Sequence, residues 1–276
     1  MSYRNPSEFV QLMIDAGESK VTMADRDVVI RAVMAGGTLA IAVALAFTAT
    51  VQTGLPIVGA LIFPVGFCIL NLMGFDLLTG VFALVPLALL DKRKGVTPGR
   101  VLYNWLLVFI GNFIGALTIA ALVAIVWTMG FQKEPGAAAQ AMVKVTTGRV
   151  LGYEEFGFAG WATCFTKGIL CNWMVSLGVV GAMLSNTVGG KVIAMWMPIL
   201  IFFALGFEHA VVNMYLFPLG MIFGAEFTVG QWAFWNELPT LLGNLVGGLL
   251  FTGFSLYATH HRTGAAKSLA EPPVSQ

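Results

Sequence analysis

The stretch Gly74-Phe75-Asp76 returns later in the chain as Gly206-Phe207-Glu208. Each stretch interrupts a long apolar run, over residues 57–90 and 192–223. Both runs exceed the roughly 20 helical residues that cross a bilayer core of about 30 Å. A glycine followed by a carboxylate in the middle of such a run favours an interrupted helix. We therefore predict two membrane crossings that are each made of two helix halves.

The two stretches belong to a longer duplication, because residues downstream of both breaks match at one constant interval. The matches include glycine, proline and asparagine, which hydrophobicity alone does not align. They pair Pro86-Leu87 with Pro218-Leu219, Asn104 with Asn236, Gly111-Asn112 with Gly243-Asn244, and Gly115 with Gly247. Each half holds three predicted crossings, and an odd number makes the second half enter from the opposite face. The prediction is an inverted repeat, which places a transport path where the broken helices meet.

Composition makes lipid the solvent for much of the chain. Its 276 residues are 58% hydrophobic and 11% charged, with a mean hydropathy of +0.83, whereas soluble proteins are about 25% charged. We predict an all-α membrane protein with six transmembrane helices, over residues 32–51, 57–90, 101–129, 158–184, 192–223 and 238–259. A net charge of +1 gives no reason to expect nucleic-acid binding. The three cysteines lack metal-ligand spacing, so we expect no metal and no cofactor.

Lysine and arginine gather on the side of the two termini, which the positive-inside rule makes cytoplasmic. The expected location is the inner or plasma membrane. Residues 1–31 should form a cytoplasmic amphipathic segment, with Ser7 as the cap of a surface helix that packs or gates. Residues 32–259 form the channel domain, with repeats of about 32–130 and 158–259 and a long loop between them. Residues 260–276 form a cytoplasmic tail.

Few ionisable side chains lie deep in the predicted membrane region: Asp76, Lys167, Glu208 and His209. Such groups are functional by default, although a lone buried histidine is more often a satisfied hydrogen-bonding residue of a core. The acids Asp76 and Glu208 correspond in the repeat, whereas His209 corresponds to Leu77. We therefore expect the acids to hold loop amides or a ring nitrogen, and His209 to serve transport.

Other polar and small residues in the apolar helices have two interpretations. Asn172 and Asn213 either line the path or cross-link helices. The small-residue faces of the third and sixth crossings are more consistent with helix contact than with transport; they consist of Gly111, Gly115, Gly243 and Gly247.

These motifs resemble those of the formate/nitrite transporter family, and the resemblance covers nearly the whole membrane region. It rests on Gly74-Phe75-Asp76-Leu77-Leu78-Thr79, Lys167-Gly168-Ile169-Leu170-Cys171-Asn172-Trp173, Gly206-Phe207-Glu208-His209, Asn213-Met214 with Pro218-Leu219-Gly220, and Gly243-Asn244-Leu245-Val246-Gly247-Gly248. The resemblance implies a homopentamer of aquaporin-like protomers, each with its own path for a small monovalent anion.

The resemblance also assigns residues to the path. The family's central histidine falls on His209, its neighbouring acid on Glu208, and the threonine of its broken second crossing on Thr79; Asp76 and Asn172 complete the predicted path. Its hydrophobic constrictions fall on Phe63, Phe67, Leu77, Val175 and Phe202. The family's outer-vestibule lysine has three candidates, with Lys144 first and Arg149 and Lys167 behind it.

A bare anion in such an apolar slit would cost many kcal/mol. Histidine, with an unperturbed pKa of about 6.5, suits a path that neutralises the ion. We hypothesise that outer cations attract the anion and that His209 supplies a proton or a positive field. Formate or nitrite is the expected permeant, with hydrosulfide, lactate and acetate left open. An aquaporin-type neutral-solute channel is the rival, but the Asn-Pro-Ala pairs are missing; an enzyme is not expected, because no nucleophile or cofactor motif accompanies the histidine.

Overall fold

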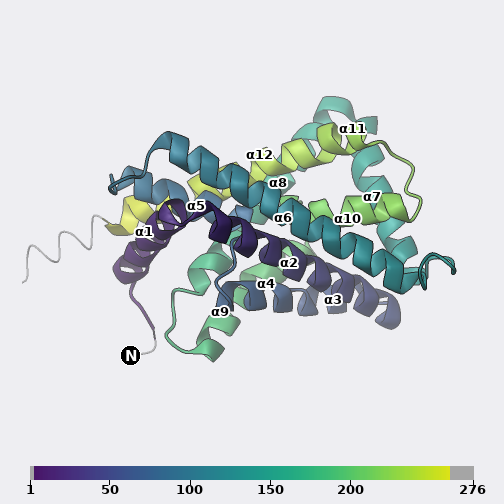
Figure 1. Cartoon of the computed structure of the whole chain (residues 1–276), viewed down its shortest axis with the longest axis horizontal. Coiled ribbons are helices and arrows are strands. Elements are labelled where there is room, and N and C mark those ends of the chain that lie inside the picture. The colour runs from purple at the N-terminus through teal and green to yellow at the C-terminus, as the bar shows by residue number, and fades with distance from the viewer. Residues whose placement is uncertain (1–2, 262–276) are drawn as a thin grey trace, which may run out of the picture.

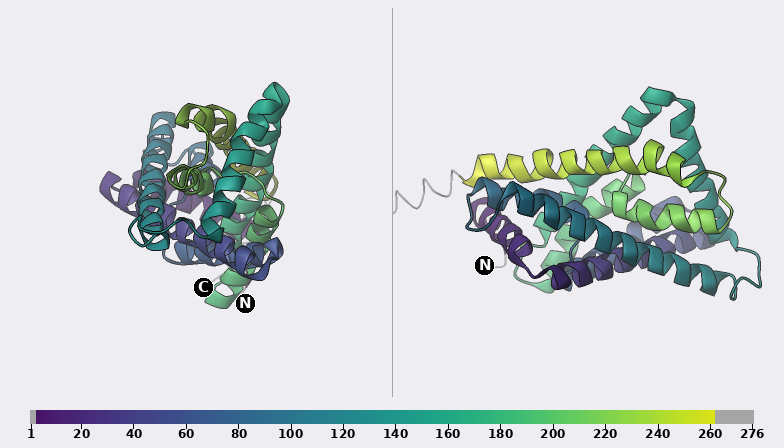
Figure 2. Two further views of the ribbon diagram at one scale, coloured as in Figure 1. Left: turned by 90° about the vertical axis from the view of Figure 1, so that its right-hand side faces the viewer. Right: turned by 45° about the horizontal axis from the view of Figure 1, so that its top comes forward.

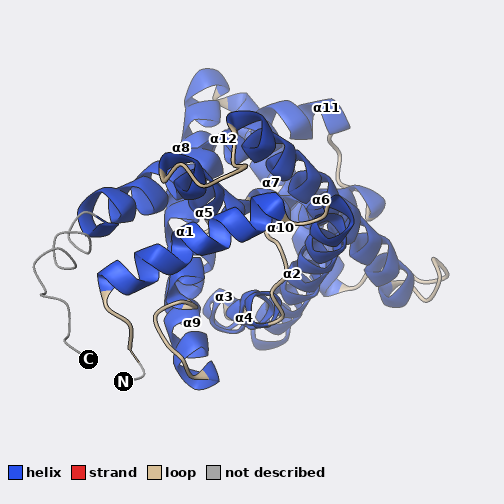
Figure 3. Ribbon diagram, turned by 60° about the vertical axis from the view of Figure 1, so that its left-hand side comes forward, coloured by secondary structure: helices blue, strands red, loops and turns tan. Residues whose placement is uncertain are grey.

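The structure is a computed structural model that describes residues 3–261, and its regular elements in that range are all helices (Figure 3). The α-helices are α1 (Pro6–Thr22), α2 (Asp25–Thr53), α3 (Pro56–Ile62), α4 (Pro64–Leu72), α5 (Leu78–Leu90), α6 (Pro98–Trp127), α7 (Ala137–Glu155), α8 (Gly157–Gly181), α9 (Val188–Ala204), α10 (Ala210–Ile222), α11 (Val229–Trp232) and α12 (Leu238–Val246). Three π-helical segments, η1 (Ala233–Glu237), η2 (Gly247–Phe254) and η3 (Tyr257–His261), continue the last α-helices.

The described helices make the six predicted crossings. Four continuous helices are long and apolar enough to span a membrane: α2, α6, α8 and the run Val229–His261 from α11 to η3. They lie along the long axis of the molecule (Figures 1 and 2). The second crossing is divided between α3–α4 and α5, and the fifth between α9 and α10. The all-α fold and the two broken helices are confirmed.

Both breaks use the same backbone turn. Gly74 and Gly206 adopt positive φ angles of 71° and 63°, a region that residues with a Cβ atom rarely enter. After each glycine, the next amide reaches back over the helix end: Phe75 N donates to Leu70 O at 2.9 Å, and Phe207 N to Phe202 O at 3.1 Å. This is a glycine-terminated helix cap, and the sequence therefore ends α4 and α9 at equivalent points.

An asparagine from the third crossing holds the first break. Asn112 on α6 donates through Nδ2 to Ala32 O at 2.7 Å and to Asp76 O at 2.9 Å, and its Oδ1 accepts from Leu78 N at 2.9 Å. One buried side chain thus joins the first crossing, the unwound segment and the first amide of α5. We call this arrangement the asparagine clamp.

The second half repeats the asparagine clamp atom for atom. Asn244 on α12 donates through Nδ2 to Gly168 O and to Glu208 O, both at 2.9 Å, and its Oδ1 accepts from Ala210 N at 2.9 Å. Asn112 and Asn244 are equivalent in the sequence duplication. The duplication therefore preserves a hydrogen-bonding device as well as a hydrophobic pattern.

Glycines let the outer helices of each half approach closely. A Cβ atom at Gly115 would lie 2.0 Å from Val33 O on α2, and one at Gly247 would lie 2.2 Å from Ile169 O on α8. A Cβ atom at Gly111 would likewise collide with α2, and one at Gly243 would collide with α8. This confirms that the small-residue faces of the third and sixth crossings are helix contacts.

The N-terminal helix is amphipathic and packs one face on the rest of the protein. Helix α1 lies against α5, and Phe9, Met13 and Ile14 are buried between them. Its cap is Asn5 rather than Ser7, because the helix begins at Pro6, two residues before the start that a Ser7 cap requires. The expected cap is therefore wrong, whereas of the two expected roles, packing or gating, the contacts show packing: the apolar stripe faces α5.

The segment between the two halves, which we expected to be a long loop, holds the 19-residue helix α7. Helix α7 packs on α8 and α10, as α1 packs on α5. Helices α1 and α7 thus occupy equivalent places in the two halves, although their sequences show no matching motif.

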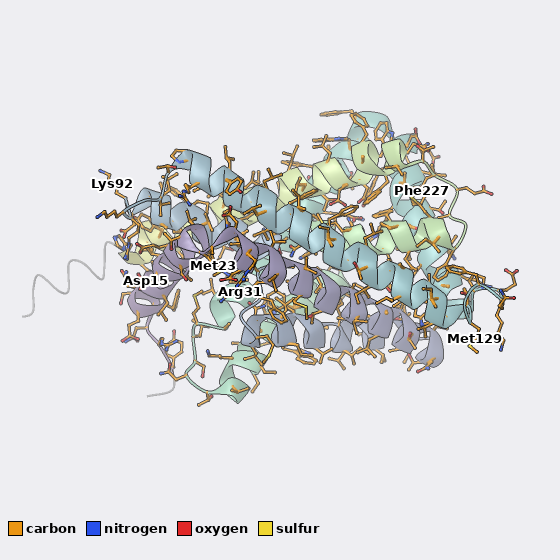
Figure 4. The ribbon with its side chains drawn as sticks, viewed as in Figure 1. Asp15, Met23, Arg31, Lys92, Met129 and Phe227 are labelled. Carbon is orange, nitrogen blue, oxygen red and sulfur yellow. The ribbon has the colours of Figure 1, made fainter. Side chains whose placement is uncertain are left out.

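Both ends of the described chain lie on one side of the molecule. The rings of Phe9 in α1 and His260 in η3 are 6.3 Å apart. Asp15 and Lys92 lie towards this end of the long axis, and Met129 and Phe227 towards the other (Figure 4). Most of the predicted C-terminal tail, residues 262–276, lies outside the described residues.

Loss of either asparagine clamp should destabilise the fold. Asn112→Ala and Asn244→Ala each leave the first amide of a helix half and one carbonyl of the unwound segment without their side-chain partner, at about 1–3 kcal/mol per buried group. We expect a lower thermal unfolding midpoint and a lower yield of assembled protein for both variants. Asn71→Ala is the control, since the side chain of Asn71 bonds only Phe67 O, in its own helix. Wild-type midpoints for both clamp variants would contradict the assignment.

Candidate functional site

The starts of α5 and α10 meet at the centre of the protein. His209 is the cap residue of α10, and its Nδ1 accepts from Val212 N at 3.2 Å. Its Nε2 lies 3.2 Å from Thr79 Oγ1 in the first turn of α5. Both side chains are buried. The structure therefore brings together two predicted path residues that lie far apart in the sequence, one from each half.

The hydrogen bonds assign the imidazole tautomer. Because Nδ1 accepts an amide proton, that nitrogen carries no proton, and the ring proton of neutral His209 belongs on Nε2. Nε2 then donates to Thr79 Oγ1. A second proton on Nδ1 would face the Val212 amide, so protonation at that atom requires the cap bond to open. The Nε2 proton of the neutral ring therefore points across the junction of the two halves, towards Thr79.

Asn172 on α8 joins the two halves next to this pair. Its Nδ2 donates to Thr79 O at 3.1 Å and to Asn244 O at 2.6 Å. The sequence left open whether Asn172 lines the path or cross-links helices. The contacts are cross-links, and they fix the position of Thr79 through its backbone carbonyl.

Aromatic rings separate this junction from the side opposite the termini. Phe202 stacks on the His209 imidazole with ring centroids 5.6 Å apart, and Phe63 meets Phe202 edge-on at 5.7 Å. The predicted constriction residues are all buried, and they are Phe63, Phe67, Leu77, Val175 and Phe202. Above Phe202 lies a largely apolar cavity of about 440 Å³, whose lining includes Phe203 and Arg149.

Glu208, next to the histidine, is surrounded by hydrogen-bond donors. Arg149 Nη1 on α7 donates to Oε2 at 3.1 Å, and the Tyr153 hydroxyl donates to Oε1 at 2.8 Å. Asn213 and Asn236 also donate to Oε2, at 3.1 and 3.3 Å. The buried carboxylate is therefore neutralised and fully bonded. It holds α7 against the fifth crossing.

Asp76 has the equivalent place in the first half, and its partner is Lys20 of α1. We expected both acids to accept from loop amides freed by the breaks. That expectation was wrong: the asparagine clamps bond those amides, and the carboxylates instead bind a cation from α1 or α7. The reason is geometric, since the clamp oxygen already occupies the position at the helix start.

The three predicted vestibule cations lie in different surroundings. Arg149 lines the cavity above Phe202 and pairs with Glu208. Lys144 is exposed, and the Lys167 ammonium lies 5.5 Å from the centre of the Tyr153 ring. Of the three candidates, Arg149 is the one that lines this cavity, whereas Lys144, the first candidate from the sequence, does not.

Sequence reasoning missed several residues that build this site. Asn112 and Asn244 were visible only as repeat markers, although their exact recurrence was a usable signal. Tyr153 and Lys20 lie on α7 and α1, which carry no shared motif. Their roles depend on tertiary contacts that the sequence pattern does not encode.

Comparison with known proteins agrees with this geometry. A sequence model described as "Formate/nitrite transporter" matches residues 7–258. The "Uncharacterized transporter YrhG" of Bacillus subtilis is 31% identical over 95% of this chain and 96% of its own length. The "Probable formate transporter" of Methanothermobacter thermautotrophicus is 31% identical over 94% of this chain and 98% of its own.

Two solved structures share the fold. One, titled "FNT family ion channel", has a TM-score of 0.76 at 24% identity and covers 92% of this chain and 98% of its own. Another, titled "Pentameric formate channel with formate bound", has a TM-score of 0.71 at 21% identity and covers 85% of this chain and 96% of its own.

Broken helices, paired halves and a central polar junction define a multi-pass membrane transport protein. The family match over nearly the whole chain makes the assignment specific. The chain belongs to the formate/nitrite transporter family, whose members are channels and transporters for anions and not enzymes.

The hydroxyl of Thr79 should matter more than its shape. Thr79→Val keeps the branched side chain but leaves His209 Nε2 without its partner. We expect a several-fold loss of anion flux with the oligomer intact, because the Asn172 bond is made by the Thr79 carbonyl. Thr79→Ser, which keeps the hydroxyl, is the matched control and should retain flux. If Thr79→Val transports at the wild-type rate, the contact between Thr79 and His209 serves local packing only.

Glu208 should be needed for assembly. Glu208→Ala leaves the Arg149 guanidinium without its buried counter-ion, a change that costs about 3–5 kcal/mol in comparable pairs. We expect a lower thermal midpoint, and a milder effect for Glu208→Gln, whose amide oxygen still accepts. Glu155→Ala, at an exposed position of α7, is the control. A fully stable Glu208→Ala oligomer with altered ion selectivity would indicate a direct role in the path instead.

Proposed function

We propose that this protein carries formate, or the similar anion nitrite, through a separate path in each protomer. The observation that carries the proposal is the junction of His209 with Thr79, buried between the two breaks and beneath the Phe202 ring. The N-terminal ends of α5 and α10 also meet there, and the partial positive charge of both helix ends favours an anion. Formate is favoured because relatives and a structural neighbour are named for it.

The apolar constrictions support a proton-linked route. An anion between Phe63 and Phe202 has no hydrogen-bonding partner from either ring, so crossing as a neutral acid lowers the desolvation cost. The imidazole of His209 stacks on Phe202, with ring centroids 5.6 Å apart. In the proposed cycle, Arg149 attracts the anion from the cavity. His209 takes up a second proton on Nδ1 as its cap bond to Val212 N opens, and the imidazolium then gives one proton to the anion and returns to the neutral ring. The aquaporin-type alternative is disfavoured because its paired Asn-Pro-Ala motifs are missing and a carboxylate stands at each break.

The assembly and orientation are part of the same proposal. The exposed apolar side chains on α2, α6 and α12 suit lipid or neighbouring protomers, and a structural neighbour is titled a pentamer. We propose a homopentamer in the inner or plasma membrane. Lys92, Arg93 and Lys94 lie in the loop after α5, on the side of the termini, so both termini are placed in the cytoplasm.

Replacement of His209 should alter the pH dependence of transport and not the fold. We expect proteoliposomes with the wild-type protein to take up formate faster as the outside pH falls, and His209→Asn to flatten this dependence. Asparagine can still accept from Val212 N, so the oligomer should persist on size exclusion. Liposomes without protein set the background rate of formate uptake. Unaltered pH-dependent uptake by His209→Asn would remove the proton-donor role.

Parallel uptake of formate, nitrite and a neutral solute such as glycerol tests the permeant class. We expect formate and nitrite to compete with each other and glycerol to stay at the background rate. Glycerol flux without formate flux would defeat the proposed function.

A further inference from the structure

Glu237 is a buried carboxyl that the proposed path does not use. It ends η1, within the continuous helical run Val229–His261. The residue is partly exposed, yet both carboxyl oxygens are fully buried. Within residues 3–261 neither oxygen has a hydrogen-bond partner. The exposed part is therefore the aliphatic stem, and the carboxyl group points inward.

The surroundings offer this carboxyl no counter-ion. Trp232, one turn earlier, presents its indole Nε1 nearby, but in the described part of the chain that nitrogen also makes no hydrogen bond. The indole stacks on Phe217 at 5.7 Å and on Phe113 at 6.4 Å, so the neighbourhood is apolar. A carboxylate anion without a partner is costly in such a place, whereas the neutral acid is much less so.

The titratable groups around Glu237 are already committed or carry no positive charge. From α7, Arg149 and Tyr153 bond Glu208, and Glu154 accepts from Gln231. From α8, the neutral Cys164 thiol lies 3.5 Å from the carbonyl oxygen of Asn236, and the Lys167 ammonium lies over the Tyr153 ring and pairs with neither oxygen of Glu237.

The remaining neighbours add only negative or neutral groups. Glu208 at the break lies close enough to repel a second negative charge. Helix α10 carries no charged side chain, and its Tyr215 hydroxyl is buried. Each of the two other membrane-embedded acids, Asp76 and Glu208, has its own cation. A neighbouring protomer could not supply one to Glu237, because the chain's own atoms already cover both oxygens.

The repeat singles out Glu237 in the same way as His209. Its counterpart in the first half is Trp105, just as the counterpart of His209 is Leu77. Each ionisable group stands in the second half where the first half has an apolar side chain. Glu237 also follows Asn236 directly, and Asn236 donates to Glu208 Oε2 at 3.3 Å. A covalent neighbour therefore links the carboxyl to the polar cluster at the fifth crossing.

We propose that Glu237 is a proton-binding site in the half of the membrane domain opposite the termini. It holds a proton as a neutral carboxylic acid, and Asn236 couples its protonation to the Glu208 cluster. When the proton leaves, the new negative charge lies near Glu208 and competes for Arg149, the cation that lines the outer cavity. The ligand of this site is the proton itself. The site stands independently of His209 and of the identity of the permeant.

Infrared spectroscopy of the purified, reconstituted protein at neutral pH tests the site directly. A protonated carboxyl gives a carbonyl stretch that an ionised one lacks. We expect Glu237→Gln to lose such a band that the wild type shows. Asp76→Asn is the matched control and should keep it, because Asp76 pairs with Lys20 in the other half of the protein. A wild-type spectrum in which Glu237→Gln removes no carboxylic-acid band would overturn the proposal.

Two further measurements complete the test. Glutamine resembles the neutral acid in shape and charge, so Glu237→Gln should unfold at the wild-type temperature; a marked loss of stability would show that Glu237 is ionised and paired, against the proposal. The pH profile of formate uptake should shift in Glu237→Gln, and an unshifted profile would overturn the coupling through Asn236. If the proposed function is wrong, the wild-type protein will show no formate uptake. The infrared band of Glu237 will still be present, so the two proposals can fail separately.

Discussion

Backbone that leaves a helix inside a membrane has no water to bond, so each freed amide and carbonyl group must find a partner within the protein. The asparagine clamps meet this demand with one side chain per break. Asn112 and Asn244 use both amide protons and the amide oxygen, and each bond ends on backbone rather than on another side chain. Because the clamps satisfy the breaks, the carboxylates beside them are released for a different task. The helix halves can then present their positive ends to the junction with their first amides bonded.

The carboxylates fix the two helices that flank the repeat. Asp76 holds α1 through Lys20, and Glu208 holds α7 through Arg149. A buried ion pair is weak evidence for stability, because desolvation offsets much of the attraction. Its value here is positional: it places a specific helix against a specific break on each side of the membrane. The two pairs make α1 and α7 part of the repeat in space, although only the crossings reveal the repeat in sequence.

The sequence predicted those features that a membrane enforces. Span lengths, the two glycine breaks and the duplication follow from hydrophobicity and from residues that few others can replace, and Gly74 and Gly206 behave as expected. The pairing of Thr79 with His209 could be approached only through resemblance to a family. Helix α7 was missed because it is polar and buries only a narrow stripe, which resembles a loop in composition. Glu237 was missed because the sixth crossing was expected to begin after it, whereas the helical run starts at Val229.

The departures from symmetry are the most informative part of the repeat. Where both halves keep the same residue, as with the clamp asparagines, the residue serves the fold that both halves share. Where one half replaces an apolar residue with an ionisable one, the fold does not require the change, because the other half manages without it. His209 opposite Leu77 and Glu237 opposite Trp105 are two such replacements, and both lie in the half that contains Arg149. An ion that follows the proposed path therefore meets symmetric architecture but asymmetric chemistry.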